Sequence, residues 1–275
     1  MLFAATNQQR SAIPYTGRLA PSPTGLLHLG HARTFWTAFE RAKQGILWLR
    51  NEDLDAQRSK PEFVAAMVED LSWLGITWQH ELTQSTRLDA YQGALQQLLQ
   101  QGDVYPCTCS RRDLAQSIAA PHDDDDEPIY NNRCRPSAAA PATLTPDTNY
   151  RFRIPGSDPI TFTDLNAGPQ AFTPGKDFGD FLVWRKDGLP SYQLACVVDD
   201  AAMQITEVVR GRDLLKSTAR QILLQRALQI STPQYFHTEL MRDALGVRLA
   251  KRHDALSVRA LREQGLTPEQ VRAMF

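Results

Sequence analysis

The sequence predicts an α/β protein in which a parallel sheet is interrupted by an inserted α+β module. Residues 46–50 (ILWLR) have the pattern of a mostly buried strand, and they follow a helical pattern over residues 28–44 that is itself preceded by a short extended stretch. A strand, a loop, a helix and a strand in this order form a βαβ unit, whose strands lie parallel. Between residues 105 and 177, prolines, alanines and an acidic run replace the regular pattern, which indicates the insertion.

Helical periodicity and end signals place the helices of the first half. Apolar residues such as Phe35 and Phe39 recur at helical spacing, and Gly45 is expected to end that helix. A second helix is expected to begin with Pro61 in its first turn and Ser59 as its cap. A third runs through residues 91–99.

Regular patterns return after residue 178. Residues 181–184 (FLVW) and 192–198 (YQLACVV), separated by a tight turn at residues 186–188, are predicted to form a hairpin-like pair of strands. A strand over residues 208–211 and a helix over residues 218–228 complete the second half of the predicted sheet domain.

We therefore expect a frayed tail over residues 1–13, a sheet domain in two halves over residues 14–104 and 178–275, and an inserted module over residues 105–177. The formal net charge of −1 disfavours a protein that coats nucleic acid indiscriminately. No apolar run is long enough to span a membrane, and residues 1–11 lack the pattern of a secretory signal, so a cytoplasmic protein is expected.

The segment PSPTGLLHLGH, residues 21–31, lies where a strand leads into a helix, so backbone N–H groups face any anion placed there. His28 and His31 are three residues apart and share one face of the first turn, while Gly30 leaves room for a flat ring to approach the backbone. Two imidazole donors beside a purine and a phosphate chain can bind ATP and stabilise the charge that grows as pyrophosphate leaves. The alternative is two ordinary surface histidines.

Residues 17–31 resemble the signature of the glutamyl-tRNA synthetase group of class I aminoacyl-tRNA synthetases. The resemblance continues in the expected order through residues 50–55, 74–76, 192–194, 198–200 and 209–211. It implies a Rossmann-type catalytic domain that activates an amino acid with ATP and Mg²⁺. It also implies a glutamate pocket made by Arg18, Leu19, Ala20, Pro21, Ser22, Glu52, Tyr192 and Arg210.

The chemistry of these residues agrees with a glutamate ligand, which brings two carboxylates and one ammonium. Arg18 and Arg210 are candidates for forked pairing with carboxylate, and Glu52 is a candidate for the ammonium. Tyr192 can donate its hydroxyl to the ligand. The alternative for each arginine is a surface ion pair, worth only ~0–1 kcal/mol.

A second catalytic element is expected near the C-terminus, where residues 248–252 (RLAKR) resemble the mobile Lys-Met-Ser-Lys loop of the family. Lys251 matches the second lysine and would neutralise phosphate charge in the transition state. Arg248 preserves the charge of the first lysine, whereas Ala250 replaces the usual serine and puts the catalytic rate in doubt. We expect replacement of Lys251 by alanine to abolish adenylate formation.

Three clustered cysteines, Cys107, Cys109 and Cys134, form a soft ligand set that prefers zinc. A fourth ligand would close a structural tetrahedron, with His122 as one candidate. The resemblance to the zinc-bearing members of the group implies Tyr130 instead. One structural Zn²⁺ per chain is expected, and three buried thiols in an apolar core are the alternative.

The chain ends at Phe275, a short helix pair beyond Lys251, so no anticodon-binding domain is expected. This pattern is similar to the glutamyl-Q tRNA(Asp) synthetases, which activate L-glutamate without tRNA and transfer it to the queuosine base at the wobble position of tRNA(Asp). The resemblance implies three partners: ATP, L-glutamate and the anticodon stem-loop of tRNA(Asp) carrying queuosine. A monomer is expected. The alternatives are a catalytic fragment of a glutamyl-tRNA synthetase that charges tRNA(Glu), or a non-catalytic relic that binds tRNA or nucleotide.

Overall fold

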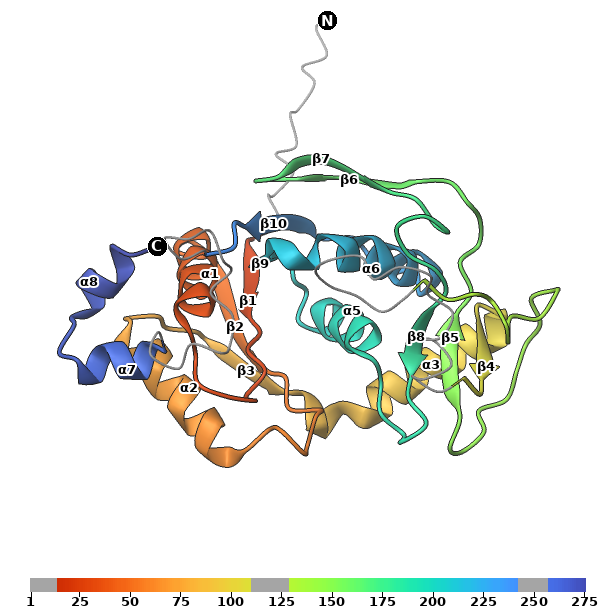
Figure 1. Cartoon of the computed structure of the whole chain (residues 1–275), viewed down its shortest axis with the longest axis horizontal. Coiled ribbons are helices and arrows are strands. Elements are labelled where there is room, and N and C mark those ends of the chain that lie inside the picture. Colours follow the sequence, from red (N-terminus) through yellow and green to blue (C-terminus); the bar gives the residue numbers. More distant parts are fainter. Residues whose placement is uncertain (1–13, 110–128, 242–256) are drawn as a thin grey trace, which may run out of the picture.

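Parallel strands joined by helices organise the first part of the protein, as the computed structural model shows for residues 14–109, 129–241 and 257–275 (Figure 1). Strands β1 (Thr16–Leu19), β2 (Ile46–Asn51) and β3 (His80–Thr83) lie side by side in a three-stranded parallel sheet. Helix α1 (Leu29–Arg41) links the first pair and α2 (Pro61–Trp73) links the second. The predicted βαβ unit is therefore confirmed, since parallel neighbours need a crossover of this kind.

A second parallel pair extends this arrangement. Strands β9 (Glu207–Gly211) and β10 (Gln234–Thr238) pair in parallel and are connected by η2 (Arg212–Leu214) and helix α6 (Leu215–Ala227). The chain just before β9 meets the start of β1, where the Thr206 amide donates to the Thr16 carbonyl at 2.9 Å. The two parallel groups thus lie next to each other.

The segment between these halves contributes two further groups of strands. Strands β4 (Val104–Cys107), β5 (Asn149–Phe152) and β8 (Phe181–Trp184) form an antiparallel sheet. The hairpin of β6 (Ile160–Asp164) and β7 (Gly168–Phe172) instead joins the edge of β10, giving the order β7-β6-β10-β9 (Figure 1). Strand pairing therefore crosses the expected boundary at residue 178, and the division into domains stays a prediction.

Two hydrophobic clusters hold these layers together. One surrounds β1, β2 and α2 and includes the completely buried Leu19 and Leu71. The other lies under α3 (Leu88–Gln101), α5 (Tyr192–Ala202) and α6, with Tyr91 and Phe181 among its buried side chains. Burial at about 25 cal/mol per Å² of apolar surface makes such clusters the main stabilising contribution.

The C-terminal helices return to the first sheet. Helix α7 (Val258–Glu263) begins where the Val258 amide donates to the Leu27 carbonyl at 2.7 Å, and α8 (Pro268–Arg272) follows it. Ser257 also bridges to His28, so the chain after the undescribed residues 242–256 comes back to the wall of the candidate site. None of the helices in the described ranges is long and apolar enough to cross a membrane.

Two local predictions are wrong. Residues 192–198 form the first turns of α5 rather than a strand: the chain does turn back after β8, but the Ser191 side chain then accepts from the Leu194 amide and begins a helix. Val197 and Val198 of this segment have high strand propensity, which tertiary packing overrides. The cap of α2 is Lys60, not Ser59, whose hydroxyl is buried without a hydrogen-bond partner in the described chain.

Candidate active site

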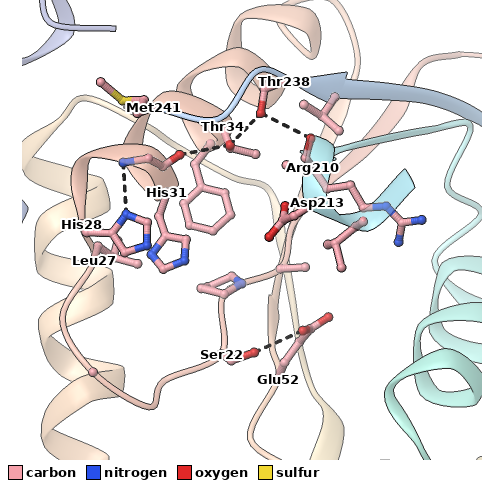
Figure 2. A pocket seen from close by; sticks show the side chains of 18 of the residues that line it. Ser22, Leu27, His28, His31, Thr34, Glu52, Arg210, Asp213, Thr238 and Met241 are labelled. Atoms are coloured by element: carbon pink, nitrogen blue, oxygen red, sulfur yellow. Dashed lines mark hydrogen bonds between the residues drawn. The ribbon is translucent and has the colours of Figure 1, made fainter. Parts of the chain in front are cut away.

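A cavity of about 650 Å³ opens between the ends of β1 and β9 and the start of α1 (Figure 2). Of the residues predicted for glutamate or ATP that the structure describes, all except Leu19 line it: Arg18, Ala20, Pro21, Ser22, His28, Gly30, His31, Glu52, Tyr192 and Arg210. These residues come from segments nearly 200 positions apart. The structure therefore brings the two predicted sites together in one space.

Figure 2 shows the His28 and His31 side chains next to each other on one wall of the cavity. Their rings stack with centroids 3.7 Å apart, as the three-residue spacing predicted. His28 is the N-cap of α1, and its Nδ1 accepts from the Gly30 amide at 3.1 Å. In a neutral imidazole the proton then lies on Nε2, which makes this atom a donor for an anionic ligand.

The position of the His28 ring explains why residue 30 is a glycine. A Cβ at this position would lie 3.1 Å from Cε1 and 3.2 Å from Nδ1 of His28. The flat ring that approaches the Gly30 backbone is thus the imidazole of His28, which caps the helix in this position.

Glu52 lies on the opposite side of the cavity, where it accepts from the Ser22 hydroxyl at 3.3 Å (Figure 2). Its other oxygen accepts from the completely buried guanidinium of Arg50 at 2.9 Å. Arg50 also donates to Asp200 at 2.6 Å. Burial by itself lowers the pKa of Arg50, but the charges of Asp200 and Glu52 outweigh it and raise that pKa. Arg50 therefore stays cationic and orients the Glu52 carboxylate.

Arg18 spans the gap between the two parallel groups of strands. Its Nη1 donates to the Val209 carbonyl of β9 at 2.7 Å, and its Nε lies 3.5 Å from Asp200. The side chain is 3% exposed, and Nε has no hydrogen-bond partner in the described part of the protein. The ion pair with Asp200 partly compensates the buried charge of Arg18, and the cavity that Arg18 lines places a ligand carboxylate within reach of its guanidinium.

Arg210 is held by uncharged groups. It is 4% exposed and donates to His237, Gln221, Thr218 and, at 3.4 Å, to the hydroxyl of Tyr192. None of these four partners in the described chain is a carboxylate. A buried guanidinium without a carboxylate partner is a natural binding group for an anionic ligand.

The cavity also contains residues that sequence reasoning missed. Thr34 and Thr238 share a hydrogen bond of 2.9 Å between their hydroxyls, and Thr238 donates to the Arg210 carbonyl at 3.3 Å (Figure 2). Asp213 adds a second carboxylate, and its position depends on Gly211, where a Cβ would lie 2.5 Å from Asp213 Oδ1. No motif marks these residues, although Asp213 follows the Arg210 segment closely.

Two predicted site residues are not found in the cavity lining: Leu19 lies elsewhere, and Lys251 falls outside the described residues. Leu19 is completely buried in the cluster around β1 and does not line the cavity, so its side chain packs in the core. Lys251, together with Arg248 and Ala250, lies outside the described residues.

The predicted metal ligands converge at the end of β4. The sulfurs of Cys107, Cys109 and Cys134 lie within 4.8 Å of one another, and the Tyr130 hydroxyl is 3.6 Å from the first two. Burial acts to raise the pKa of Cys134, but hydrogen bonds from Tyr130 and Thr108 lower it to about 6. This group could hold a metal ion, and its donors suit zinc. His122 lies outside the described residues.

The chain is similar to known proteins over most of its length. Residues 15–275 match the family described as tRNA synthetases class I (E and Q), catalytic domain. A glutamyl-Q tRNA(Asp) synthetase of Geobacter sulfurreducens is 47% identical over 91% of this chain and 79% of its own. A glutamate–tRNA ligase of Aquifex aeolicus is 40% identical over 92% of this chain and 54% of its own. The crystal structure of a glutamate tRNA ligase of Elizabethkingia meningosepticum, in complex with its amino acid, has a TM-score of 0.74 at 28% identity, over 92% of this chain and 54% of that one.

Proposed function

The chain belongs to the catalytic-domain family of the class I tRNA synthetases for glutamate and glutamine, and on this premise we propose that it activates L-glutamate with ATP and transfers it to tRNA. We propose further that activation needs no tRNA and that the acceptor is the queuosine base of tRNA(Asp). The Geobacter sulfurreducens relative, which is matched over 91% of this chain and 79% of its own, is named for that activity, and this supports the choice of acceptor.

The observation that carries the proposal is the distribution of charge in the cavity. Arg18 and Arg210 are two buried cations. Arg18 donates to a backbone carbonyl and lies 3.5 Å from one carboxylate, and the groups that accept from Arg210 within the described residues are uncharged. Glu52 supplies one oriented carboxylate. Glutamate has the complementary set of two carboxylates and one ammonium, so forked pairing with the arginines and an ion pair with Glu52 satisfy both sides.

The His28 and His31 side chains, which we call the histidine wall, line the same cavity as these charged residues and suit the nucleotide. In the proposed step, a carboxylate oxygen of glutamate attacks the α-phosphorus of ATP, an acyl–phosphate bond forms, and the bond to pyrophosphate breaks. His28 and His31 stabilise the negative charge that develops on the departing pyrophosphate. Lys251 would add a further cation, and Mg²⁺ accompanies ATP as part of the substrate.

In the second step, a hydroxyl of the queuosine cyclopentene ring attacks the acyl carbon of the adenylate, which forms an ester and releases AMP. ATP and tRNA are cytoplasmic substrates, so we assign the reaction to the cytoplasm. The chain spans about half the length of its glutamate–tRNA ligase relatives, and charging of tRNA(Glu) is the competing outcome that the experiment must separate.

We also propose one structural zinc per chain, held by Cys107, Cys109, Cys134 and Tyr130. The fit is supported by the convergence of three sulfurs and one phenolic oxygen, with Tyr130 buried and its oxygen accepting from the Cys134 amide at 2.8 Å. A closed tetrahedral site of this kind stabilises the fold and does no chemistry. It would tie β4 to the segment that precedes β5.

The test is exchange of labelled pyrophosphate into ATP by the purified chain with each standard amino acid and no tRNA. We expect exchange with glutamate alone. Glu52→Gln should abolish exchange because it removes the carboxylate for the ammonium, whereas Glu40→Gln, a change on the exposed side of α1, should retain it. Exchange that requires tRNA(Glu) would contradict tRNA-independent activation.

Transfer is then measured with tRNA(Asp) carrying queuosine, the same tRNA without it, and tRNA(Glu). We expect labelled glutamate only on the first. Stable attachment to the 3′ end of tRNA(Glu) would replace the proposed acceptor but leave glutamate activation intact.

A further inference from the structure

A buried carboxylate–imidazole pair lies directly behind Arg210. Asp164 at the end of β6 accepts from Nδ1 of His237 on β10 at 2.6 Å, and both side chains are fully buried. Nε2 of the same ring accepts from Nε of Arg210 at 3.1 Å. The three residues thus form a chain of hydrogen bonds from the β6–β7 hairpin to the candidate glutamate pocket.

The bonds around Asp164 show that it is ionised. Its Oδ1 accepts from the backbone amides of Asn166 at 3.0 Å and Ala167 at 2.7 Å. Burial acts to raise the pKa of Asp164, but the hydrogen bonds from Ala167, His237 and Asn166 outweigh it and lower that pKa. A carboxylate has only acceptors, so Nδ1 of His237 must carry a proton.

The other nitrogen of His237 must then be an acceptor. Burial, with the charge of Arg210, lowers the pKa of His237 to about 4, so the ring is neutral near pH 7 with its one proton on Nδ1. Nε2 offers a lone pair to Arg210, and the Thr218 hydroxyl lies 3.2 Å from the same atom. In the other tautomer, Nε2–H would point at the Arg210 N–H and the two donors would repel each other.

We propose that Asp164 and His237 are positioning residues that fix the orientation of Arg210 by selecting the imidazole tautomer, and that they thereby set the affinity for the substrate carboxylate bound by Arg210. The pair does not line the cavity. The proposal rests on the proposed function in one respect, namely that Arg210 binds a carboxylate of glutamate. The tautomer itself can be tested independently of any substrate.

Asp164→Asn is the informative variant because it replaces one acceptor oxygen by a donor NH₂ group while the side chain keeps its shape. The new amide oxygen can still accept from Asn166 and Ala167, which leaves the NH₂ group facing Nδ1 of His237. Nδ1 then has to accept, the proton moves to Nε2, and the ring presents a donor to Arg210. Arg210 can no longer keep its present orientation.

The first measurement is the imidazole ¹⁵N chemical shifts of the ¹⁵N-labelled full chain, with the His237 signals assigned by their loss in His237→Gln. We expect the proton on Nδ1 in the wild type and on Nε2 in Asp164→Asn. A wild-type spectrum with the His237 proton on Nε2 overturns the proposal whether or not Asp164→Asn folds.

The second measurement is glutamate-dependent pyrophosphate exchange. Loss of an oriented charged hydrogen-bonding group should raise the KM for glutamate about 10- to 100-fold in Asp164→Asn. The kcat and the KM for ATP should stay within about twofold, because the histidine wall is untouched. Asp158→Asn, an exposed change of the same charge just before β6, is the matched control and should behave as wild type.

A double-mutant cycle separates positioning from general damage. His237→Gln keeps a neutral acceptor but has no tautomer to select, so Asp164→Asn should have little further effect on the KM for glutamate in that background. An equal increase in both backgrounds, or a parallel fall in kcat, overturns the proposal. If glutamate supports no exchange in the wild type, the proposed function fails, while the ¹⁵N spectra still decide the role of the pair.

Discussion

Arg50 donates from Nη2 to Oε1 of Glu52 at 2.9 Å, and the two residues lie only two positions apart at the end of β2. The guanidinium is completely inaccessible to solvent and also binds Asp200 of α5 at 2.6 Å. Arg50 therefore compensates two carboxylates and ties the first sheet to the helix that carries Tyr192.

We expect Arg50→Met to lower the free energy of unfolding by about 3–5 kcal/mol, because it removes the buried cation that pairs with both Asp200 and Glu52. Urea denaturation at neutral pH measures the change. Arg58→Met is the matched control: Arg58 binds Asp55 at 2.6 Å but is largely exposed, so its loss should cost ~0–1 kcal/mol. Equal losses in the two variants would show that the buried network is not a special source of stability.

His28 has two separable roles, as a helix cap and as a proposed donor to ATP. His28→Asn should preserve the cap, since asparagine is among the best capping residues, but it removes the imidazole. We expect its melting temperature to match the wild type while pyrophosphate exchange falls about 10²- to 10³-fold. His28→Ala should lose the cap as well, at about 1 kcal/mol. Wild-type exchange in His28→Asn would exclude a catalytic role for the ring.

Asp70 on α2 is completely buried, and neither carboxylate oxygen has a hydrogen-bond partner within the described ranges. Burial raises the pKa of Asp70 to about 6. Above about pH 6 the folded protein must keep an unfavourable charge, whereas below it the folded state binds a proton that the unfolded chain binds only near pH 4. Asp70 thus costs stability at high pH, and this cost disappears as the pH falls.

We therefore expect Asp70→Asn to be more stable than the wild type by about 2–3 kcal/mol at pH 8. The difference should shrink as the pH falls through 6 and vanish near pH 4. Urea denaturation over this range measures it, with the exposed Asp158→Asn as control. A difference that does not change with pH would refute the assigned ionisation.

Metal analysis of protein purified without added metal should find one zinc per chain. Cys134→Ser should lose the metal, because it removes one of three converging sulfurs. Tyr130→Phe should release zinc to a chelator faster, since its oxygen is the proposed fourth ligand. Cys196→Ser should keep the metal: this cysteine lies near Glu52, away from the cluster. Metal-free wild-type protein would contradict the zinc site.

Several elements could be predicted because their signals are local. The three-residue spacing of His28 and His31 places both rings on one face of a helix, and they do stack. The periodic apolar residues of α1 and the buried strand β2 predicted the parallel unit, which the structure confirms. The strand predicted at residues 192–198 is wrong because valines suit both a strand and the buried face of a helix, and contacts with the rest of the core decide between them.

The sequence alone determined the family, the chemical types of the pocket residues and most of the elements that carry them, since these depend on motifs and on backbone preferences over a few neighbouring residues. Only the tertiary structure decided which side chains meet. Asp164 and His237 are 73 positions apart, and neither belongs to a recognisable motif. The strand pairing of β6 with β10 brings them together, and burial then makes their single shared proton decisive for Arg210.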